Sequence, residues 1–161
     1  MMPFEAWTAS RRGIRLPLVY VIRNEVVFGR AVRVCLQSSL RDRRAVGRIA
    51  RYFTEETGAG SVWASDGREH DRTSTAYLVL PAGCDARPCV VQAHAIGAAV
   101  FRNDVDRGRV LDGVWLHPAH RRQGILTGLW PHLRETEGAF AISPPVSPAM
   151  RAFLEKLGGK A

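Results

Sequence analysis

Residues 117–126 read His117-Pro118-Ala119-His120-Arg121-Arg122-Gln123-Gly124-Ile125-Leu126, and they lie between a β-rich run, residues 110–116, and a helix predicted to begin near Gly124. A strand followed by a short basic loop and a helix N-terminus directs several backbone N–H groups and the positive end of the helix dipole at one point. Gly124 has no Cβ, so a phosphate can come close to the backbone there, and Arg121 and Arg122 add positive charge. The segment therefore predicts an anion-binding site.

The residues nearer the start of the chain predict two β-rich runs and one helix. Residues 16–22 and 26–35 are separated by Arg23-Asn24-Glu25, a pattern typical of a hairpin or of two neighbouring strands. Ser39 followed three residues later by Asp42 resembles a capping box and marks the start of a helix. This helix is predicted to end at Gly58 and Gly60. Its apolar stripe at helical spacing comprises Ala45, Val46, Ile49, Ala50 and Phe53.

The middle of the chain predicts three further strands. Residues 74–80 are strand-like and precede a turn at residues 81–88. Residues 90–102 and 109–116 are expected to be consecutive antiparallel strands joined by a turn at residues 103–108. The second of these strands leads directly into the basic loop.

Length and composition indicate one globular domain. A chain of 161 residues with 46% apolar and 24% charged side chains is long enough to bury a single core. Residues 1–13 have no sustained apolar stretch and do not resemble a secretory signal, and the longest apolar run, residues 16–22, is too short to span a bilayer. We therefore expect a cytoplasmic protein with no membrane partner.

The three cysteines, Cys35, Cys84 and Cys89, do not suggest a metal site. They contain no Cys-x-x-Cys pair, and their spacing does not match a zinc ligand set. We expect free thiols and no bound metal. A local disulfide between Cys84 and Cys89 remains open, although the expected compartment disfavours it.

The net charge of +8 indicates a surface that attracts polyanions. Such partners include RNA, anionic protein segments and the phosphates of a nucleotide cofactor. Solubility alone is the alternative explanation, and charge by itself does not choose between them. Most of the excess is arginine, at positions 11–12, 41–51 and 121–122.

The basic loop resembles the cofactor loop of the GCN5-related N-acetyltransferase (GNAT) superfamily, which runs Pro-x-x-Arg-x-x-Gly-x-Gly/Ala after the fourth strand. Pro118, Arg121 and Gly124 match this spacing, whereas Leu126 stands where the family usually has a small residue. The resemblance implies acetyl-CoA as co-substrate, with its pyrophosphate on the loop and its pantetheine arm paired with the preceding strand. The implied loop residues are Arg121, Arg122, Gln123, Gly124, Ile125 and Leu126, and the implied strand residues are Val114, Trp115 and Leu116.

The same resemblance implies an α/β (α+β) fold, with a GNAT-like mixed, mostly antiparallel central sheet flanked by helices and splayed between its fourth and fifth strands. Residues 139–142 are expected to be the fifth strand, and residues 148–157 the next helix, capped by Ser147. Pro131 should kink or end the helix that follows the loop. The expected organisation is one acetyltransferase-like domain over residues 1–161, with N-terminal strands in 1–37, a helix and central strands in 38–108 and the acetyl-CoA-binding core in 109–161.

Two features of the family pattern are expected to be lacking. Only four residues follow Leu157, so we expect no C-terminal hairpin. The sheet edge that this exposes is expected to be covered by the N-terminal strands or by a second subunit in a homodimer. The Tyr that protonates the leaving thiolate in many members is replaced by Leu154.

A more local likeness, to the cohesin-type acetyltransferases, rests on residues 114–116, 121–125 and 141–145. It implies a polar active-site residue at Ser143, which could orient water or protonate the thiolate, while turn formation beside Pro144 is its alternative role. For the general base, Asp112 on the fourth strand is the candidate, with a structural role as the alternative. His94 and His117 near strand ends are further candidates.

The resemblance implies an acetyl-CoA-dependent N-acetyltransferase acting on a protein lysine, an N-terminus or a small amine. The arginine-rich surface keeps open a tRNA partner, as in an aminoacyl-tRNA-acetylating enzyme of the toxin kind. A non-catalytic acyl-CoA-binding module and a plain nucleic-acid-binding module are the remaining alternatives. The last of these leaves the Pro-x-x-Arg-x-x-Gly pattern unexplained.

Overall fold

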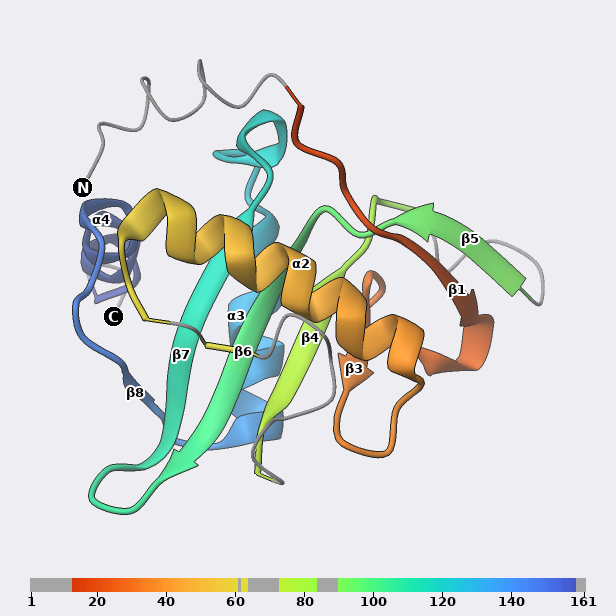
Figure 1. Cartoon of the computed structure of the whole chain (residues 1–161). Helices are drawn as coiled ribbons and strands as arrows, with labels where there is room; N and C mark the ends of the chain where they lie inside the picture. The colour runs from red at the N-terminus through yellow and green to blue at the C-terminus, as the bar shows by residue number, and fades with distance from the viewer. Residues whose placement is uncertain (1–12, 61, 64–72, 84–89, 159–161) are drawn as a thin grey trace.

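The structure is a computed structural model that describes residues 13–60, 62–63, 73–83 and 90–158. Its strands form two sheets, and helices cover both faces of the larger one (Figure 1). β1 (Leu18–Ile22) and β5 (Val90–His94) pair as a separate antiparallel ribbon. The larger sheet has the order β2 (Val26–Val27), β3 (Ala31–Val34), β4 (Thr75–Val79), β6 (Gly97–Asp104), β7 (Gly108–Leu116) and β8 (Ala141–Ile142). Only β7 and β8 are parallel, so the predicted mixed, mostly antiparallel sheet is confirmed.

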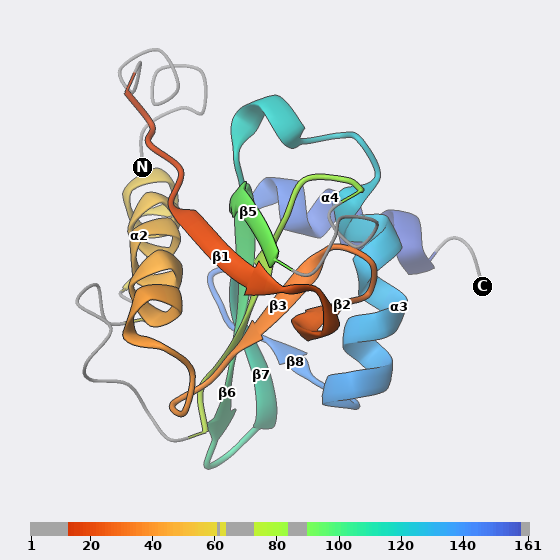
Figure 2. The same ribbon diagram turned by 90° about the vertical axis from the view of Figure 1, so that its right-hand side faces the viewer.

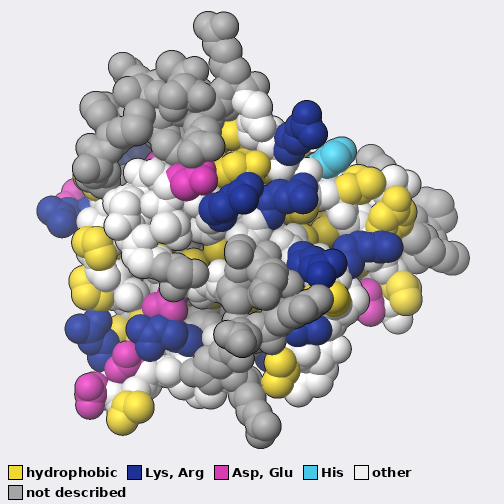
Figure 3. Space-filling view, in the orientation of Figure 1, with side chains coloured by type: hydrophobic (Ala, Val, Ile, Leu, Met, Phe, Trp, Pro, Cys, Tyr) yellow, Lys and Arg dark blue, Asp and Glu magenta, His cyan; other side chains and the backbone are white. Residues whose placement is uncertain are grey.

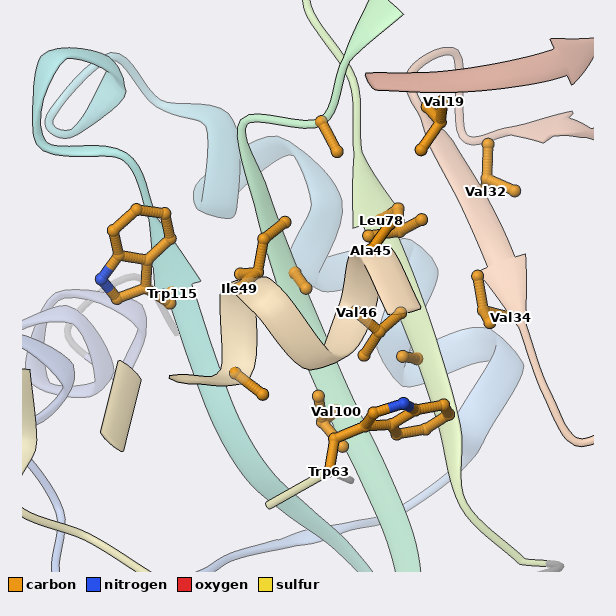
Figure 4. Close-up of a cluster of buried hydrophobic side chains, with 14 of the residues drawn as sticks. Val19, Val32, Val34, Ala45, Val46, Ile49, Trp63, Leu78, Val100 and Trp115 are labelled. Atoms are coloured by element: carbon orange, nitrogen blue, oxygen red, sulfur yellow. The ribbon is translucent and has the colours of Figure 1, made fainter. Parts of the chain in front are cut away.

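Helix α2 (Leu40–Thr57) begins and ends where the sequence predicts. The Ser39 hydroxyl accepts the Asp42 N–H at 3.2 Å, and Gly58 ends the helix in the left-handed conformation, with φ of 70°. Its apolar stripe lies against one face of the larger sheet, where Val46 and Ile49 face side chains such as Val100 (Figure 4). Burial of this face provides the main support for the helix.

The opposite face of the sheet is covered by α3 (Ile125–Glu137) and α4 (Pro148–Gly158). Figure 2 shows α2 on one side of the strands and α3 on the other. Leu129 and Leu133 of α3 pack with Phe101 of the sheet, and the Trp130 ring contacts Phe153 of α4. The predicted cap of α4 is confirmed, because the Ser147 hydroxyl accepts the Met150 N–H. The sheet thus separates two hydrophobic cores.

Residues 26–35, expected as one strand, form the short hairpin of β2 and β3. Phe28 and Gly29 have positive φ values of 57° and 74°, and the Arg30 N–H donates to the Val27 carbonyl, so the chain reverses. A left-handed non-glycine residue costs about 1–2 kcal/mol. The Phe28 ring stacks on His132 of α3 at 5.0 Å, which helps to offset that cost. The preceding strand β1 does not join this hairpin, because η1 (Arg23–Glu25) leads away and β1 pairs with β5.

The run at residues 90–102 is also two strands rather than one, because the chain changes sheet between them. The Ala95 N–H donates to the Pro17 carbonyl at 2.9 Å, beside the ribbon of β1 and β5. The next N–H, that of Ile96, donates to the Val79 carbonyl of β4 at 2.8 Å. Both residues are buried, so the hydrophobic pattern gives no sign of the break.

Pro131 does not end α3, which continues to Glu137. The missing proline N–H leaves the Thr127 carbonyl without its helical partner. Thr127 and Pro131 are both exposed, so water can satisfy that carbonyl. Of the two expected outcomes, a kink or an end at Pro131, the end was therefore wrong.

The predicted splay lies between β7 and β8. These strands pair only at Val110 with Ala141 and at Leu111 with Ile142. The Ser143 N–H donates to the Leu111 carbonyl at 3.0 Å, and the chain then turns away while β7 continues to Leu116. Among the described residues, the last part of β7 has no strand partner on this side.

The N-terminal strands do not cover the β8 edge. β2 and β3 extend the opposite edge of the larger sheet, so the N-terminal strands, the first of the two expected covers, were wrong, and a second subunit stays a prediction. Cys35 is a free thiol, whereas Cys84, Cys89 and the end of the predicted 81–88 turn lie outside the described residues. In the described part of the chain, no helix combines the length and the apolarity needed to cross a bilayer.

Candidate active site

The loop between β7 and α3 is held by its own residues. It begins with η3 (Pro118–His120), where the Nδ1 atom of His117 accepts the Ala119 N–H at 3.1 Å. The side-chain amide of Gln123 donates to the Ala119 carbonyl at 2.9 Å. These local bonds define the path of the chain up to Gly124.

Two residues of this loop adopt the left-handed backbone conformation. Arg122 has φ of 60° and Gly124 has φ of 77°. Left-handed non-glycine residues are uncommon, and they gather at ligand-binding sites. A Cβ placed on Gly124 would meet no atom within 4 Å, so this position opens onto free space. A ligand can therefore approach the backbone closely there.

The N-terminus of α3 presents unpaired donors at this opening. Gly124 is the N-cap residue and has no side-chain hydrogen bond to the helix, and the first helical bond runs from Gly128 N to Gly124 O. The N–H groups of Ile125, Leu126 and Thr127 therefore have no acceptor within the described part of the chain. Together with the helix dipole they form a site suited to a phosphate.

Arg121 fastens this loop to the other layer of the molecule. Its guanidinium makes a bidentate pair with Glu56 of α2, with both N–O distances 2.7 Å. Its Nε donates to the Leu116 carbonyl at 2.8 Å. The indole of Trp115 donates to the same Glu56 carboxylate at 2.7 Å. The Arg121 side chain thus positions the loop, and the exposed Arg122 side chain is the one available to an anion.

The charge of the loop also acts on His117. Burial lowers the pKa of His117, and the nearby His120 and Arg121 lower it further. A neutral imidazole is the form that can accept the Ala119 N–H. The loop is therefore built around an uncharged His117.

The strand before the loop offers an open backbone edge. The His117 N–H donates to the Ile96 carbonyl beside β6, and peptide groups alternate along a strand. The peptide groups of Val114 and Leu116 consequently point to the side that β8 leaves open. Trp115 points its N–H to β6, and its indole is buried against Tyr52 and Glu56 on the α2 face.

Asp112 and Ser143 lie near the point where the strands separate. A bulge in the pairing of β6 with β7 leaves Asp112 unpaired between Leu111 and Gly113. The carboxylate of Asp112 accepts from Arg102 Nε at 2.6 Å and is mostly buried. Ser143 is half-buried and bonds through its N–H to Leu111, one residue from Asp112 in sequence.

Glu56 and Arg102 were not predicted from the sequence. Glu56 bonds to a residue 65 positions away, and no local pattern marks it as different from its neighbour Glu55. Arg102 precedes Asp112 by ten positions across the turn between β6 and β7. The antiparallel register of these strands, extended by one bulged residue, was the signal that could have suggested this pair.

These features suit a ligand that carries phosphates at one end and an extended chain of amides at the other. The helix N-terminus can hold the phosphates, and the free edge of β7 can pair with amides as another strand would. The bulge and Ser143 lie at the far end of that edge, where polar side chains can contact the reacting group.

Comparisons with known proteins support the fold. The sequence matches no protein-family model and no curated protein. The structure resembles that of the xEco2 acetyltransferase domain bound to a K105-CoA conjugate, with a TM-score of 0.57 and 11% identity over 86% of this chain and 91% of that one. It also resembles a ribosomal-protein-alanine N-acetyltransferase from Brucella melitensis biovar Abortus 2308, with a TM-score of 0.51 and 16% identity over 79% of this chain and 89% of that one.

Both similar structures are acetyltransferases, and both are covered almost completely. At these identities the likeness concerns the fold. The mostly antiparallel sheet with helices on both faces thus has a GNAT-like fold, as the resemblance of the basic loop implied.

Proposed function

We propose that this protein is an acetyl-CoA-dependent N-acetyltransferase. The observation that carries the proposal is the uncapped N-terminus of α3 at Gly124, next to the open edge of β7. The helix N-terminus matches the pyrophosphate of coenzyme A, and the neighbouring unpaired strand edge matches its pantetheine arm. The fold shared with acetyltransferases supports the same reading.

In this proposal the loop binds the pyrophosphate. The N–H groups from Gln123 to Leu126 donate to its oxygens, and the Arg122 guanidinium supplies charge. Ile125 is buried and Leu126 partly buried in the core below, so their backbone groups are held in place. Arg121 contributes through its bond to Glu56.

The pantetheine arm pairs with β7 in the same proposal. The peptide groups of Val114 and Leu116 are the ones directed at the open side, while Trp115 packs beneath them. Because Arg121 Nε already donates to the Leu116 carbonyl, the Leu116 N–H is the free group at that residue. Pantetheine can therefore make only a few hydrogen bonds to β7 near the loop.

Acetyl-CoA supplies the acetyl group as an activated thioester. The acceptor amine forms a bond to the acetyl carbon, the bond from that carbon to sulfur breaks, and a backbone N–H at the bulge stabilises the carbonyl oxygen. Asp112 accepts the proton that the amine loses. Ser143 donates its hydroxyl proton to the departing thiolate and regains a proton from water. The acceptor supplies the amine.

The first test is calorimetric titration of the purified protein with acetyl-CoA, with desulfo-CoA and ATP as controls. Micromolar binding that ATP does not reproduce is the expected result. A folded protein that binds no acetyl-CoA contradicts the proposal. Binding without acetyl transfer to any amine identifies a non-catalytic acyl-CoA-binding module instead.

A matched pair of variants at Gly124 tests the position of the phosphates. Asn and Asp have the same shape and both tolerate the left-handed conformation, so the variants share any backbone strain. Gly124→Asp places a negative charge at the proposed phosphate site and should bind acetyl-CoA at least about tenfold more weakly than Gly124→Asn, a difference of about 1.4 kcal/mol. Equal affinities of the two folded variants would contradict the assignment of this loop.

A further inference from the structure

The outer surface of α2 carries a row of arginines that the proposed acetyl transfer does not use. Its members recur three or four positions apart, which places them on one side of the helix, away from the apolar stripe. All four are exposed. Figure 3 shows dark blue side chains gathered over α2 and beside β1. The residues of this arginine row are Arg41, Arg44, Arg48 and Arg51.

Carboxylates offset part of the positive charge of the arginine row, since Asp42 interacts with Arg41 and Glu55 with Arg51. Arg51 lies 3.9 Å from Glu55, at the geometric limit of an ion pair, and is more than half exposed. Arg15, also exposed, joins the same surface, because its backbone N–H donates to the hydroxyl of Tyr52 on α2. The row thus adds to the positive field indicated by the net charge of +8.

One end of the arginine row opens into a groove beside β1. The groove has a volume of about 690 Å³. Tyr20 and Ile22 line it and are 46% and 53% exposed, unusual values for large apolar side chains. The Arg41 guanidinium lies over the Tyr20 ring, 4.7 Å from its centre. The groove also contains two carboxylates, those of Glu25 and Asp42.

We propose that this surface binds single-stranded RNA, with phosphates along the arginine row and an unstacked base in the groove at Tyr20. Arginines in a row on one helix face suit a phosphate backbone, and an exposed ring beside them suits a base. The strand is single because a base inside a duplex cannot reach the groove.

The carboxylates of the groove favour RNA over an acidic peptide as the ligand. Glu25 and Asp42 repel a carboxylate-rich segment, but they can accept hydrogen bonds from base N–H groups, such as the N3–H of uracil, and from a ribose 2′-hydroxyl. The 2′-hydroxyl is also the group that favours RNA over DNA at such a site.

The surface leads toward the candidate active site. Arg51 lies five positions before Glu56, which holds Arg121 of the basic loop. RNA bound along α2 therefore comes close to the loop. This last step, unlike the RNA binding itself, rests on the proposed acetyl transfer. With that activity, the acceptor is an amine carried by RNA.

The test is fluorescence anisotropy of a labelled 12-nucleotide oligo(U) RNA titrated with the full chain over a salt series. With about four phosphates neutralised, log K should fall against log salt with a slope of about −3. Arg48→Gln/Arg51→Gln should weaken binding at least about tenfold and reduce that slope by about 1.4. The matched control, Arg107→Gln/Arg151→Gln, removes the same charge from exposed positions in the β6–β7 turn and on α4. It should change the affinity less than about twofold if long-range charge is screened.

The aromatic part of the proposal has its own pair of variants. Tyr20→Ala should weaken RNA binding about tenfold, because base stacking on an aromatic ring is lost, whereas Tyr20→Phe should retain it. Equal losses for the two arginine pairs, equal affinity for oligo(dT) DNA, or equal competition by polyglutamate would each overturn the proposal.

The fate of this proposal is separable from that of the proposed acetyl transfer. RNA binding by a protein that fails to bind acetyl-CoA supports the RNA surface and removes the acetyltransferase. Acetyl-CoA binding by a protein that fails to bind the RNA overturns the RNA surface and leaves the acetyltransferase intact.

Discussion

Glu56 is the residue that joins the basic loop to the helix on the opposite face of the sheet. Its carboxylate receives two bonds from Arg121 and one from Trp115, all at 2.7 Å. The side chains of Arg121 and Glu56 are 26% and 14% exposed, so solvent screens this pair only in part. We therefore expect the position of the loop to depend on the Glu56 carboxylate.

Glu56→Gln tests this dependence. The amide keeps the size of the side chain but loses the charge, so the variant should lose about 2 kcal/mol of unfolding free energy. It should also bind acetyl-CoA about tenfold more weakly, because the loop is no longer held in place. Denaturant unfolding and calorimetric titration measure the two effects. The control is Glu55→Gln, and equal effects of the two variants on acetyl-CoA affinity would show that Glu56 does not position the loop.

His117 predicts a pH dependence of stability. Burial lowers its pKa, so the folded protein keeps the imidazole neutral where the unfolded chain, titrating at about 6.5, takes up a proton. The unfolded state then binds more protons, and the unfolding free energy falls as the pH falls below about 6.5. His117→Asn, which retains a side-chain acceptor for the Ala119 N–H, should lose less stability between pH 7.5 and pH 5.5 than the parent protein.

Denaturant unfolding at the two pH values checks this, with His132→Asn at an exposed histidine as the control. This variant also loses the stacking on Phe28, which should lower the unfolding free energy by a similar amount at both pH values. An unchanged pH dependence in His117→Asn would show that other groups are responsible.

At the scale of elements, Gly97 determines how closely β6 and β7 pair at the start of the basic loop. A Cβ at Gly97 would collide with the carbonyl oxygen of Trp115 and with the side chain of Leu116. Because the obstacle includes backbone, Gly97→Ala should cost about 2 kcal/mol or more of unfolding free energy. It should also disturb the strand edge proposed for pantetheine.

The comparison variant is Gly128→Ala in α3. A Cβ at Gly128 meets no atom within 4 Å, so alanine should stabilise the helix by about 0.5–1 kcal/mol. In denaturant unfolding, the unfolding free energy should fall in Gly97→Ala and rise in Gly128→Ala. A Gly97→Ala variant as stable as the parent would mean that the strands can separate without cost.

Elements with local signals were predicted well, and those without them were not. Ser39 and Gly58 mark the ends of α2 because caps are hydrogen bonds between near neighbours. The division of residues 90–102 has no such mark, since Ala95 and Ile96 are both apolar and both buried. The Ala95 N–H bonds beside the small ribbon and the Ile96 N–H bonds to the larger sheet. The break therefore depends on acceptors that are distant in the sequence.

At the scale of the whole molecule, the sheet divides the protein into two layers with separate cores. α2 packs with one core, and α3 and α4 pack with the other. The bond between Glu56 and Arg121 passes from one layer to the other beside the end of β7. The proposed cofactor loop and the proposed RNA surface are therefore built on different layers and are linked by this bond.

The sequence by itself determined the basic loop, the helix that follows it, the caps of α2 and the Ser147 cap of α4, and its family resemblance implied the GNAT-like fold class. These depend on residues a few positions apart, whose hydrogen bonds and apolar spacing are visible in the chain. Only the tertiary structure decided that β1 pairs with β5, that Glu56 holds Arg121 and that Arg102 pairs with Asp112. Such contacts join residues separated by up to 76 positions, as Leu18 and His94 are, and they depend on strand register and on which faces pack together.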